Sequence, residues 1–257
     1  MQEGDILKIV KYKKIKNKYK VYLDNDDTLD LYENIILKYN LLLKKEITDK
    51  NIDIIKEDNN KEEAYEKALN YINIKMRSTK EIYNYLKKKE YSNILIDEII
   101  EKLKKSNFLN DELYIKSYIN DKINLSIDGP IKIKNYLIHQ NLDETIIDKY
   151  IYDIDNKLLR NKLDTLINKK IKTIKNASGN VLKYKVLNYF INLGYDKYMI
   201  EDTLSSKNLK NDGGEKEYNK LFNKYSKKLS GYELENTIRQ KLYQKGYDYN
   251  EIKKSID

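Results

Sequence analysis

The sequence predicts a mainly α-helical protein, in which tandem three-helix repeats form a curved, elongated array behind a small N-terminal region containing a β-hairpin. Three observations support this prediction. β-Branched and aromatic residues are mixed with lysines near the N-terminus, as in strands. From Lys61 onward the apolar residues follow helical spacing. One five-position apolar template recurs four times at a nearly constant period, which is typical of repeat proteins.

The N-terminal hairpin is predicted for "ILKIVKYKKIKNKYKVYL", Ile6 to Leu23, with its turn near "KNK". Every charged side chain from Lys8 to Lys20 is a lysine, so one face of the hairpin would be basic. Lysines often protect a solvated sheet edge against aggregation. We favour that interpretation over a functional basic face.

The acidic stretch "DNDDTLD", Asp24 to Asp30, has carboxylates at alternating positions, as a calcium loop does. A calcium loop also needs glycine at its sixth position and glutamate at its twelfth, where Leu29 and Ile35 stand. The stretch is therefore interpreted as a turn leading into a helix over "LYENIILKY", residues 31–39.

The apolar template has spacings of 4, 5, 5 and 4, and successive copies begin 51, 53 and 52 residues apart. Each copy predicts a helical hairpin, because a spacing of 4 keeps residues on one helix face and a spacing of 5 around a turn residue interrupts the helix. The expected breakers are Glu90, Asn141, Gly194 and Gly246, of which Glu90 tolerates a left-handed backbone least well. The template residues are Ile82, Leu86, Tyr91, Ile96, Ile100; Ile133, Leu137, Leu142, Ile147, Ile151; Val186, Phe190, Tyr195, Ile200, Leu204; and Ile238, Leu242, Tyr247, Ile252, Ile256.

Helix start signals agree with this organisation. Capping-box spacing is present at Ser78 with Glu81, Ser230 with Glu233 and Asp248 with Glu251, and Pro130 suits a first helical turn. A third amphipathic helix is expected ahead of each hairpin, near residues 62–76, 111–124, 157–175 and 215–229. The predicted domains are an N-terminal region over 1–60 and three-helix repeats over 61–108, 109–156, 157–210 and 211–257.

Composition excludes several classes of chemistry. The chain has 257 residues, no cysteine and one histidine, His139, so disulfides, thiolate zinc sites and cysteine nucleophiles are impossible. A glycine-rich phosphate loop is also missing from the sequence. We therefore expect no enzyme, no catalytic residue, no metal site and no cofactor. The chain also lacks a secretory signal and any apolar run of about 18 residues, so we expect a cytoplasmic protein without a membrane partner.

The formal net charge of +9 suggests an acidic partner such as nucleic acid. Compositional drift toward AT-rich codons explains the same excess, because Lys, Asn, Ile and Tyr dominate the chain. Tyrosines can stack on single-stranded nucleic acid. However, Tyr91, Tyr195 and Tyr247 occupy the central template position, where core packing is expected.

Three segments resemble the RecX family of recombinase regulators. "ALNYINIKMRSTKEIYNYLKKKEY", from Ala68, resembles the beginning of that family's first repeat, with an Arg-Ser-x-x-Glu step at Arg77. "KLKKSNFLNDELYIKSYINDK", from Lys102, and "GPIKIKNYLIHQNL", from Gly129, resemble two further family segments. The departures from the family pattern are Asn110 for an aspartate, Tyr114 and Ile115 for a Phe-Ala pair, and Asn141 for a glycine.

The resemblance implies a curved repeat protein that binds the RecA filament in its helical groove and restrains recombinase activity, without a catalytic site. We expect the protein to be a monomer. Single-stranded or double-stranded DNA is a further candidate partner. The alternative is a helical protein that binds nucleic acid without any recombinase. The candidate contacts, taken as exposed residues beside the motifs, are Arg77, Lys80, Lys87, Lys88, Lys132 and Lys134.

Overall fold

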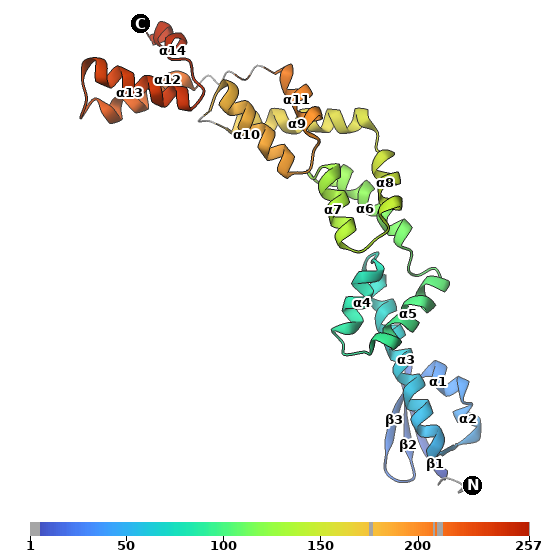
Figure 1. Ribbon diagram of the computed structural model, residues 1–257. Coiled ribbons are helices and arrows are strands. Elements are labelled where there is room, and N and C mark those ends of the chain that lie inside the picture. The colour runs from blue at the N-terminus through green and yellow to red at the C-terminus, as the bar shows by residue number, and fades with distance from the viewer. Residues whose placement is uncertain (1–5, 175–176, 208, 210–212, 257) are drawn as a thin grey trace. The chain divides into compact units, whose positions relative to one another are not determined.

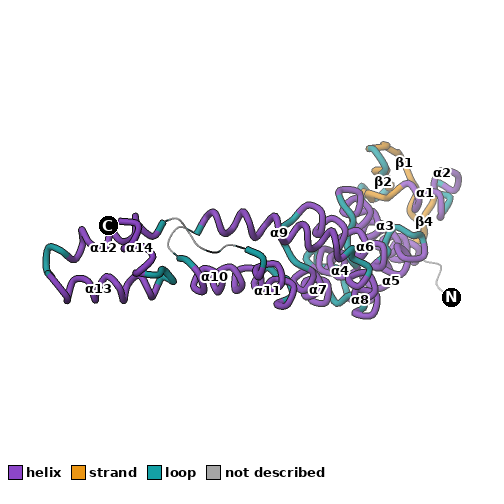
Figure 2. Tube along the Cα trace, turned by 90° about the horizontal axis from the view of Figure 1, so that it is seen from above, coloured by secondary structure: helices purple, strands orange, loops and turns teal. Residues whose placement is uncertain are grey.

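The computed structural model describes residues 6–174, 177–207, 209 and 213–256 (Figure 1). Mainly helical structure with a small N-terminal sheet is confirmed, and Figure 2 shows the strands confined to the N-terminal part of the chain. The chain divides into two compact units, residues 1–114 and 115–257, and each is described by itself.

The N-terminal sheet is antiparallel, with the strand order β3-β2-β1-β4. The predicted hairpin is confirmed, since β1 (Ile6–Ile15) pairs with β2 (Lys18–Leu23) around a two-residue turn. The prediction of a helix over residues 31–39 is wrong at its start, because β3 (Thr28–Tyr32) occupies that segment. A short strand, β4 (Glu46–Thr48), also forms where none was predicted.

Three helices cover one face of this sheet: α1 (Glu33–Lys38), α2 (Leu41–Lys44) and α3 (Asp49–Ile74). Helix α3 begins well before the predicted residue 62 and crosses the proposed boundary at residue 60. Its polar middle is joined to the edge of the sheet through Asn59. The Asn59 side chain accepts from the Tyr32 N–H at 2.8 Å and donates to the Asp30 carbonyl at 3.0 Å.

The remaining helices follow the predicted order of four helical hairpins, each preceded by a third helix. The helices that precede the hairpins are α3, α6 (Asp111–Leu125), α9 (Asn156–Thr173) and α12 (Gly214–Tyr225). The hairpins are α4 (Thr79–Lys87) with α5 (Asn93–Lys105), α7 (Pro130–His139) with α8 (Glu144–Tyr152), α10 (Gly179–Asn192) with α11 (Lys197–Ser205), and α13 (Gly231–Gln244) with α14 (Tyr249–Ile256).

The four hairpin turns have one geometry. Glu90, Asn141, Gly194 and Gly246 all have left-handed backbone, with φ of 67°, 58°, 85° and 79°. Each breaker donates its N–H to the carbonyl three residues back, at 2.8–3.0 Å, and the next residue donates to the carbonyl five residues back, at 3.0–3.4 Å. This pair of bonds defines a Schellman motif, which satisfies carbonyls at the end of the first helix. The predicted breakers are therefore confirmed.

The template also identifies the buried face of each hairpin. Every described template side chain is buried except Ile151, which is half-buried; the side chain of Ile256 lies outside the described residues. Among the start signals, Ser78 and Glu81 form a reciprocal capping box, as predicted. Ser230 is at the N-cap of α13, but its side chain does not cap the helix, so that part of the prediction is wrong.

Neighbouring repeats in the second unit are joined through these turns. The Gly129 N–H donates to the Leu193 carbonyl at 2.7 Å, and the Ile131 N–H donates to the Gly194 carbonyl at 2.9 Å. The α10–α11 turn therefore accepts from the free N–H groups that begin α7. The α13–α14 turn contacts the start of α10 similarly, since the Ser178 N–H donates to the Lys245 carbonyl at 2.9 Å.

Candidate functional site

The six candidate contact residues lie in both units. Arg77, Lys80, Lys87 and Lys88 belong to the first unit, at the start and the end of α4, whereas Lys132 and Lys134 lie on α7 in the second. They do not occupy equivalent template positions. The six residues therefore do not form one set of charges repeated from unit to unit.

Arg77 is covered, so the expectation that it is exposed is wrong. Its side chain is only 9% exposed, and its guanidinium carbon lies 3.7 Å from the centre of the Tyr71 ring. Tyr71 in turn stacks on Tyr85, with ring centres 4.2 Å apart and planes 8° apart. The Arg77 Nη1 atom is 3.3 Å from a carboxylate oxygen of Glu81. Arg77 thus ties the end of α3 to the first turn of α4.

The same carboxylate takes part in the helix cap. Glu81 accepts from the Ser78 N–H at 3.0 Å, while the Ser78 hydroxyl accepts from the Glu81 N–H at 3.2 Å. Asp111, at the start of α6, accepts from the Thr79 N–H at 2.8 Å. The Arg-Ser-x-x-Glu step is therefore a structural junction, within the first unit, of α3, α4 and the first turn of α6.

Lys87 and Lys88 remain accessible. Lys87 is exposed at the end of α4, where its ammonium donates to the Asn93 side chain at 2.7 Å. Lys88 is exposed at the C-cap of the same helix. Lysines at a helix C-terminus interact favourably with the helix dipole, so these positions also have a local structural role. Lys80, in the first turn of α4, is half-buried.

The two α7 lysines are ion-paired. Lys132 lies 2.6 Å from Asp128 and remains 52% exposed. Lys134 lies 2.6 Å from Asp148 and 3.1 Å from Glu144, and only 28% of its side chain is exposed. The Lys132 ammonium lowers the pKa of Asp128, and the two α8 carboxylates raise the pKa of Lys134. Lys134 therefore connects α7 to α8, whereas Lys132 presents a charge at the surface.

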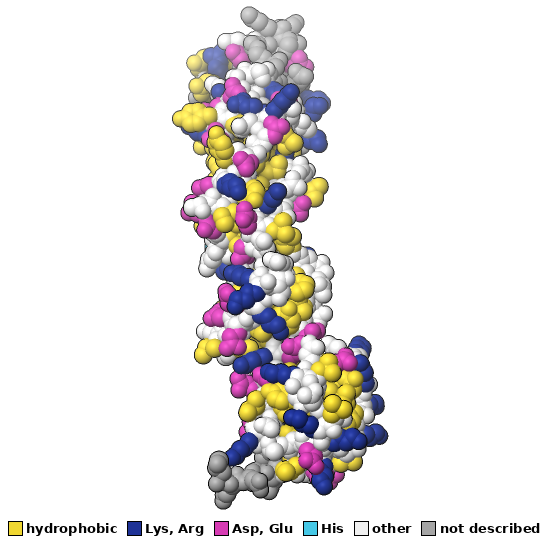
Figure 3. Space-filling model, turned by 90° about the vertical axis from the view of Figure 1, so that its right-hand side faces the viewer, with side chains coloured by type: hydrophobic (Ala, Val, Ile, Leu, Met, Phe, Trp, Pro, Cys, Tyr) yellow, Lys and Arg dark blue, Asp and Glu magenta, His cyan; other side chains and the backbone are white. Residues whose placement is uncertain are grey.

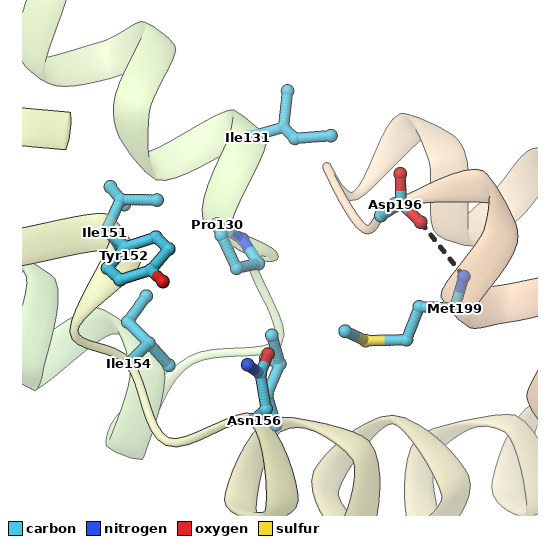
Figure 4. Close-up of a pocket in the computed structure, with 9 residues that line it drawn as sticks. Pro130, Ile131, Ile151, Tyr152, Ile154, Asn156, Asp196 and Met199 are labelled. Carbon is cyan, nitrogen blue, oxygen red and sulfur yellow. Dashed lines mark hydrogen bonds between the residues drawn. The ribbon is translucent and has the colours of Figure 1, made fainter.

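A cleft of about 380 Å³ lies in the second unit beside the joint between its first two repeats (Figure 4). Its walls include Pro130, Ile131, Tyr152 and Met199, which are predominantly apolar. Its one carboxylate, Asp196, accepts from the Met199 N–H at 3.0 Å and so caps α11. The cleft therefore contains no arrangement for acid–base or nucleophilic chemistry.

Nor do the described residues assemble a metal site, because no three His, Asp or Glu side chains among them are close enough to share an ion. His139 is the last residue of α7 and is exposed. Across the described part of the chain, every helix is too short or too polar to span a bilayer.

One structural feature was not predicted from the sequence: the close contact of Gly129 with Gly194. A Cβ atom on Gly129 would lie 2.4 Å from the Gly194 carbonyl oxygen, and one on Gly194 would lie 2.3 Å from the backbone nitrogen of Lys132. Glycine is therefore required at both positions for close backbone contact, and at Gly194 also for positive φ. The only sign of this contact in the sequence was the glycine that precedes Pro130.

Comparisons with known proteins agree with this architecture. A family model described as "RecX, first three-helix domain" matches residues 64–103, which include α4 and most of α5. A crystal structure of regulatory protein RecX has a TM-score of 0.67 and 23% identity, and it covers 78% of this chain and 100% of that chain. RecX from Lactobacillus salivarius has a TM-score of 0.52 and 27% identity over 56% of this chain and 94% of its own.

Relatives at the sequence level extend over nearly the whole chain. The regulatory protein RecX of Streptococcus uberis is 31% identical over 252 residues, covering 96% of this chain and 97% of that protein. The regulatory protein RecX of Streptococcus agalactiae is 30% identical over 257 residues, covering 97% and 98%. That of Oceanobacillus iheyensis is 28% identical over 263 residues, covering 98% and 97%. On this identity and coverage, together with the first three-helix domain, the chain belongs to the RecX family of regulatory proteins.

Proposed function

We propose that this protein is a non-enzymatic regulator that binds the RecA–DNA filament and restrains its recombinase and ATPase activity. The observation that supports this most strongly is full-length similarity to RecX regulatory proteins, with tandem helical repeats in place of a catalytic site. A filament displays identical subunits at regular intervals. Several repeats on one chain can contact successive subunits, and the combined affinity then far exceeds that of any single contact.

The contact residues within this proposal are the accessible cations. Lys87, Lys88 and Lys132 present charge at the surface, so they are the preferred candidates. Arg77 and Lys134 hold helices together within their own repeats, so their contribution is to position these surfaces. Lys80 is retained as a secondary candidate beside the capped start of α4.

Electrostatic contacts of this kind mainly set specificity and association rate. The test is binding of the full chain to RecA filaments assembled on single-stranded DNA, measured by co-sedimentation. Lys87→Glu with Lys88→Glu should weaken binding about tenfold, corresponding to about 1.4 kcal/mol.

The matched control is Lys56→Glu with Lys105→Glu. It makes the same change in net charge at two exposed lysines of α3 and α5. An equal loss of filament binding in both variants would mean that net charge alone causes the effect. That result would reject the C-terminal end of α4 as a contact surface. A protein that does not sediment with filaments at all would reject the proposed function itself.

A nucleic-acid-binding protein without a recombinase partner is the competing candidate, and the net charge of +9 favours it. It predicts that the affinity for bare DNA equals the affinity for the filament. Binding measured with and without RecA on the same oligonucleotide separates the two functions.

A further inference from the structure

The outer face of the N-terminal sheet carries a patch of lysines that the helical repeats do not involve. The strand register places Lys13 directly opposite Lys20 and Lys11 opposite Tyr22. Lys18 lies two residues before Lys20 on β2 and therefore on the same face of the sheet. We name Lys11, Lys13, Lys18, Lys20 and Tyr22 the sheet lysine patch. Residues on the other face of β2, Val21 and Leu23, are buried in the core.

Two of these lysines face each other directly across the two strands. Lys13 and Lys20 make no ion pair with any described residue, although like charges placed directly opposite each other destabilise a sheet. The nearest acidic residue in the register is Asp30, opposite Lys20 on β3. By contrast, Lys14, on the opposite face of β1, pairs with Glu33 at 2.7 Å. The outer face therefore carries an excess of positive charge, with Lys11, Lys13, Lys18 and Lys20 against the single carboxylate of Asp30 among these paired positions.

Protection of a sheet edge explains only part of this patch. Strand β2 is hydrogen-bonded on both sides, to β1 and to β3, so Lys18 and Lys20 lie on an interior strand. Lysines that prevent edge-to-edge association are expected on edge strands. That interpretation remains adequate for the part of β1 beyond Lys8, which β4 does not cover.

The spacing suits a phosphate backbone. Alternate residues of an antiparallel strand are about 6.8 Å apart, so Lys11 and Lys13 on β1, and Lys18 and Lys20 on β2, form two short rows of cations. The half-buried Tyr22 ring lies beside them, with the Lys11 ammonium 6.0 Å from its centre, and aromatic rings next to a basic track are typical of single-strand binding. Figure 3 shows Lys and Arg side chains gathered along the lower right of the drawn face.

We propose that the sheet lysine patch binds the phosphate backbone of single-stranded nucleic acid without sequence preference. This contact requires no recombinase and so goes beyond the proposed function. It would give the chain a second anchor on DNA, independent of the helical repeats.

The test measures binding of the full chain to a fluorescent oligothymidylate by anisotropy at several salt concentrations, without RecA. Each phosphate contact in a single strand contributes about 0.7 to the slope of log affinity against log salt, and about fivefold in affinity at 0.1 M salt. Lys13→Ala with Lys20→Ala should therefore lower the slope by about 1.4 and the affinity about 25-fold. Its thermal midpoint should stay at or above that of the parent, because the substitution removes a repulsion.

Lys56→Ala with Lys105→Ala is the matched control and should change the slope little, since those lysines lie on α3 and α5 outside the patch. Lys11→Ala provides a second, independent variant, for which we expect a smaller loss of oligonucleotide affinity than for the double variant. The proposal is overturned if the parent protein does not bind the oligonucleotide, or if the patch variant and the control variant lose the same amount of affinity for it. It is also overturned if the patch variant binds DNA normally but loses binding to the RecA filament, which would assign the patch to an acidic protein surface.

Discussion

Replacing Gly194 by alanine should destabilise the protein far more than replacing Gly231, although both glycines have positive φ, 85° and 55°. The surroundings of the two residues differ. A Cβ atom on Gly231 would meet no described atom within 4 Å, whereas one on Gly194 would lie 2.3 Å from the Lys132 nitrogen. Gly231→Ala therefore measures the backbone cost alone, and Gly194→Ala adds the cost of separating two repeats.

The magnitudes follow from the contacts. A left-handed alanine costs about 1–2 kcal/mol, and the lower entropy of the unfolded chain offsets about 0.4–1 kcal/mol of this. Gly231→Ala should thus cost about 0.5–1 kcal/mol. At Gly194 the two repeats must also move apart, which breaks the bonds from the Gly129 and Ile131 N–H groups, at about 1 kcal/mol each. The expected total is about 3 kcal/mol.

The assay is urea unfolding of both variants followed by circular dichroism, together with amide hydrogen exchange at Gly129 and Ile131. Exchange at these two amides should accelerate in Gly194→Ala and stay unchanged in Gly231→Ala. Gly246→Ala should resemble Gly194→Ala, because its Cβ would lie 1.9 Å from the Ser178 carbonyl oxygen. Equal destabilisation at Gly194 and Gly231, with unchanged exchange, would refute the role assigned to the joint.

Further predictions concern the buried tyrosines and the junction at Arg77. Tyr195→Phe should raise the free energy of unfolding by about 1 kcal/mol, because the buried Tyr195 hydroxyl has no hydrogen-bond partner among the described residues. Tyr91→Phe, at the equivalent template position, should lower it by about 1 kcal/mol, since the Tyr91 hydroxyl accepts from Lys67 at 2.9 Å. Burial raises the pKa of Tyr195 to about 12 from 10.0. As pH rises from 10 to 12 the unfolded chain therefore releases a proton that the folded protein retains, and stability should fall by about 2 kcal/mol from this residue, a loss that pH-dependent unfolding should not find in Tyr195→Phe. Arg77→Ala should cost about 2 kcal/mol, through loss of its Tyr71 and Glu81 contacts, whereas Lys88→Ala should stay within about 0.5 kcal/mol in the same urea assay.

The repeats could be predicted from the sequence because their signal is local. The template records the residues that each hairpin buries, and the breakers mark backbone that must be left-handed. Even Glu90 adopts this conformation, because the Schellman bonds and the buried Tyr91 hold the turn. The proposed domain limits remain predictions.

The N-terminal region was less predictable because its short elements depend on tertiary contacts. Strand β4 has three residues and forms only by pairing with the start of β1. The polar middle of α3 resembles a linker in sequence, yet Asn59 hydrogen-bonds the edge of β3. Such bonds join residues about 30 positions apart, beyond the reach of helical or strand periodicity.

The candidate site shows the same limit. Arg77 was expected to be an exposed residue beside its motif, but its guanidinium packs against the Tyr71 ring of α3, which in turn stacks on Tyr85 of α4. The opposition of Lys13 and Lys20 likewise depends on the strand register. The sequence identifies which residues are charged, and the fold determines which of those charges have partners.

The central claim is that this chain regulates the RecA filament. The most direct test is the single-stranded-DNA-dependent ATPase rate of RecA from the same organism as the protein is titrated in, with binding to the bare DNA measured in parallel. We predict inhibition at protein concentrations well below those that saturate the DNA. An unchanged ATPase rate, with bare DNA bound tightly, would contradict the claim and leave the RecX fold serving nucleic-acid binding alone.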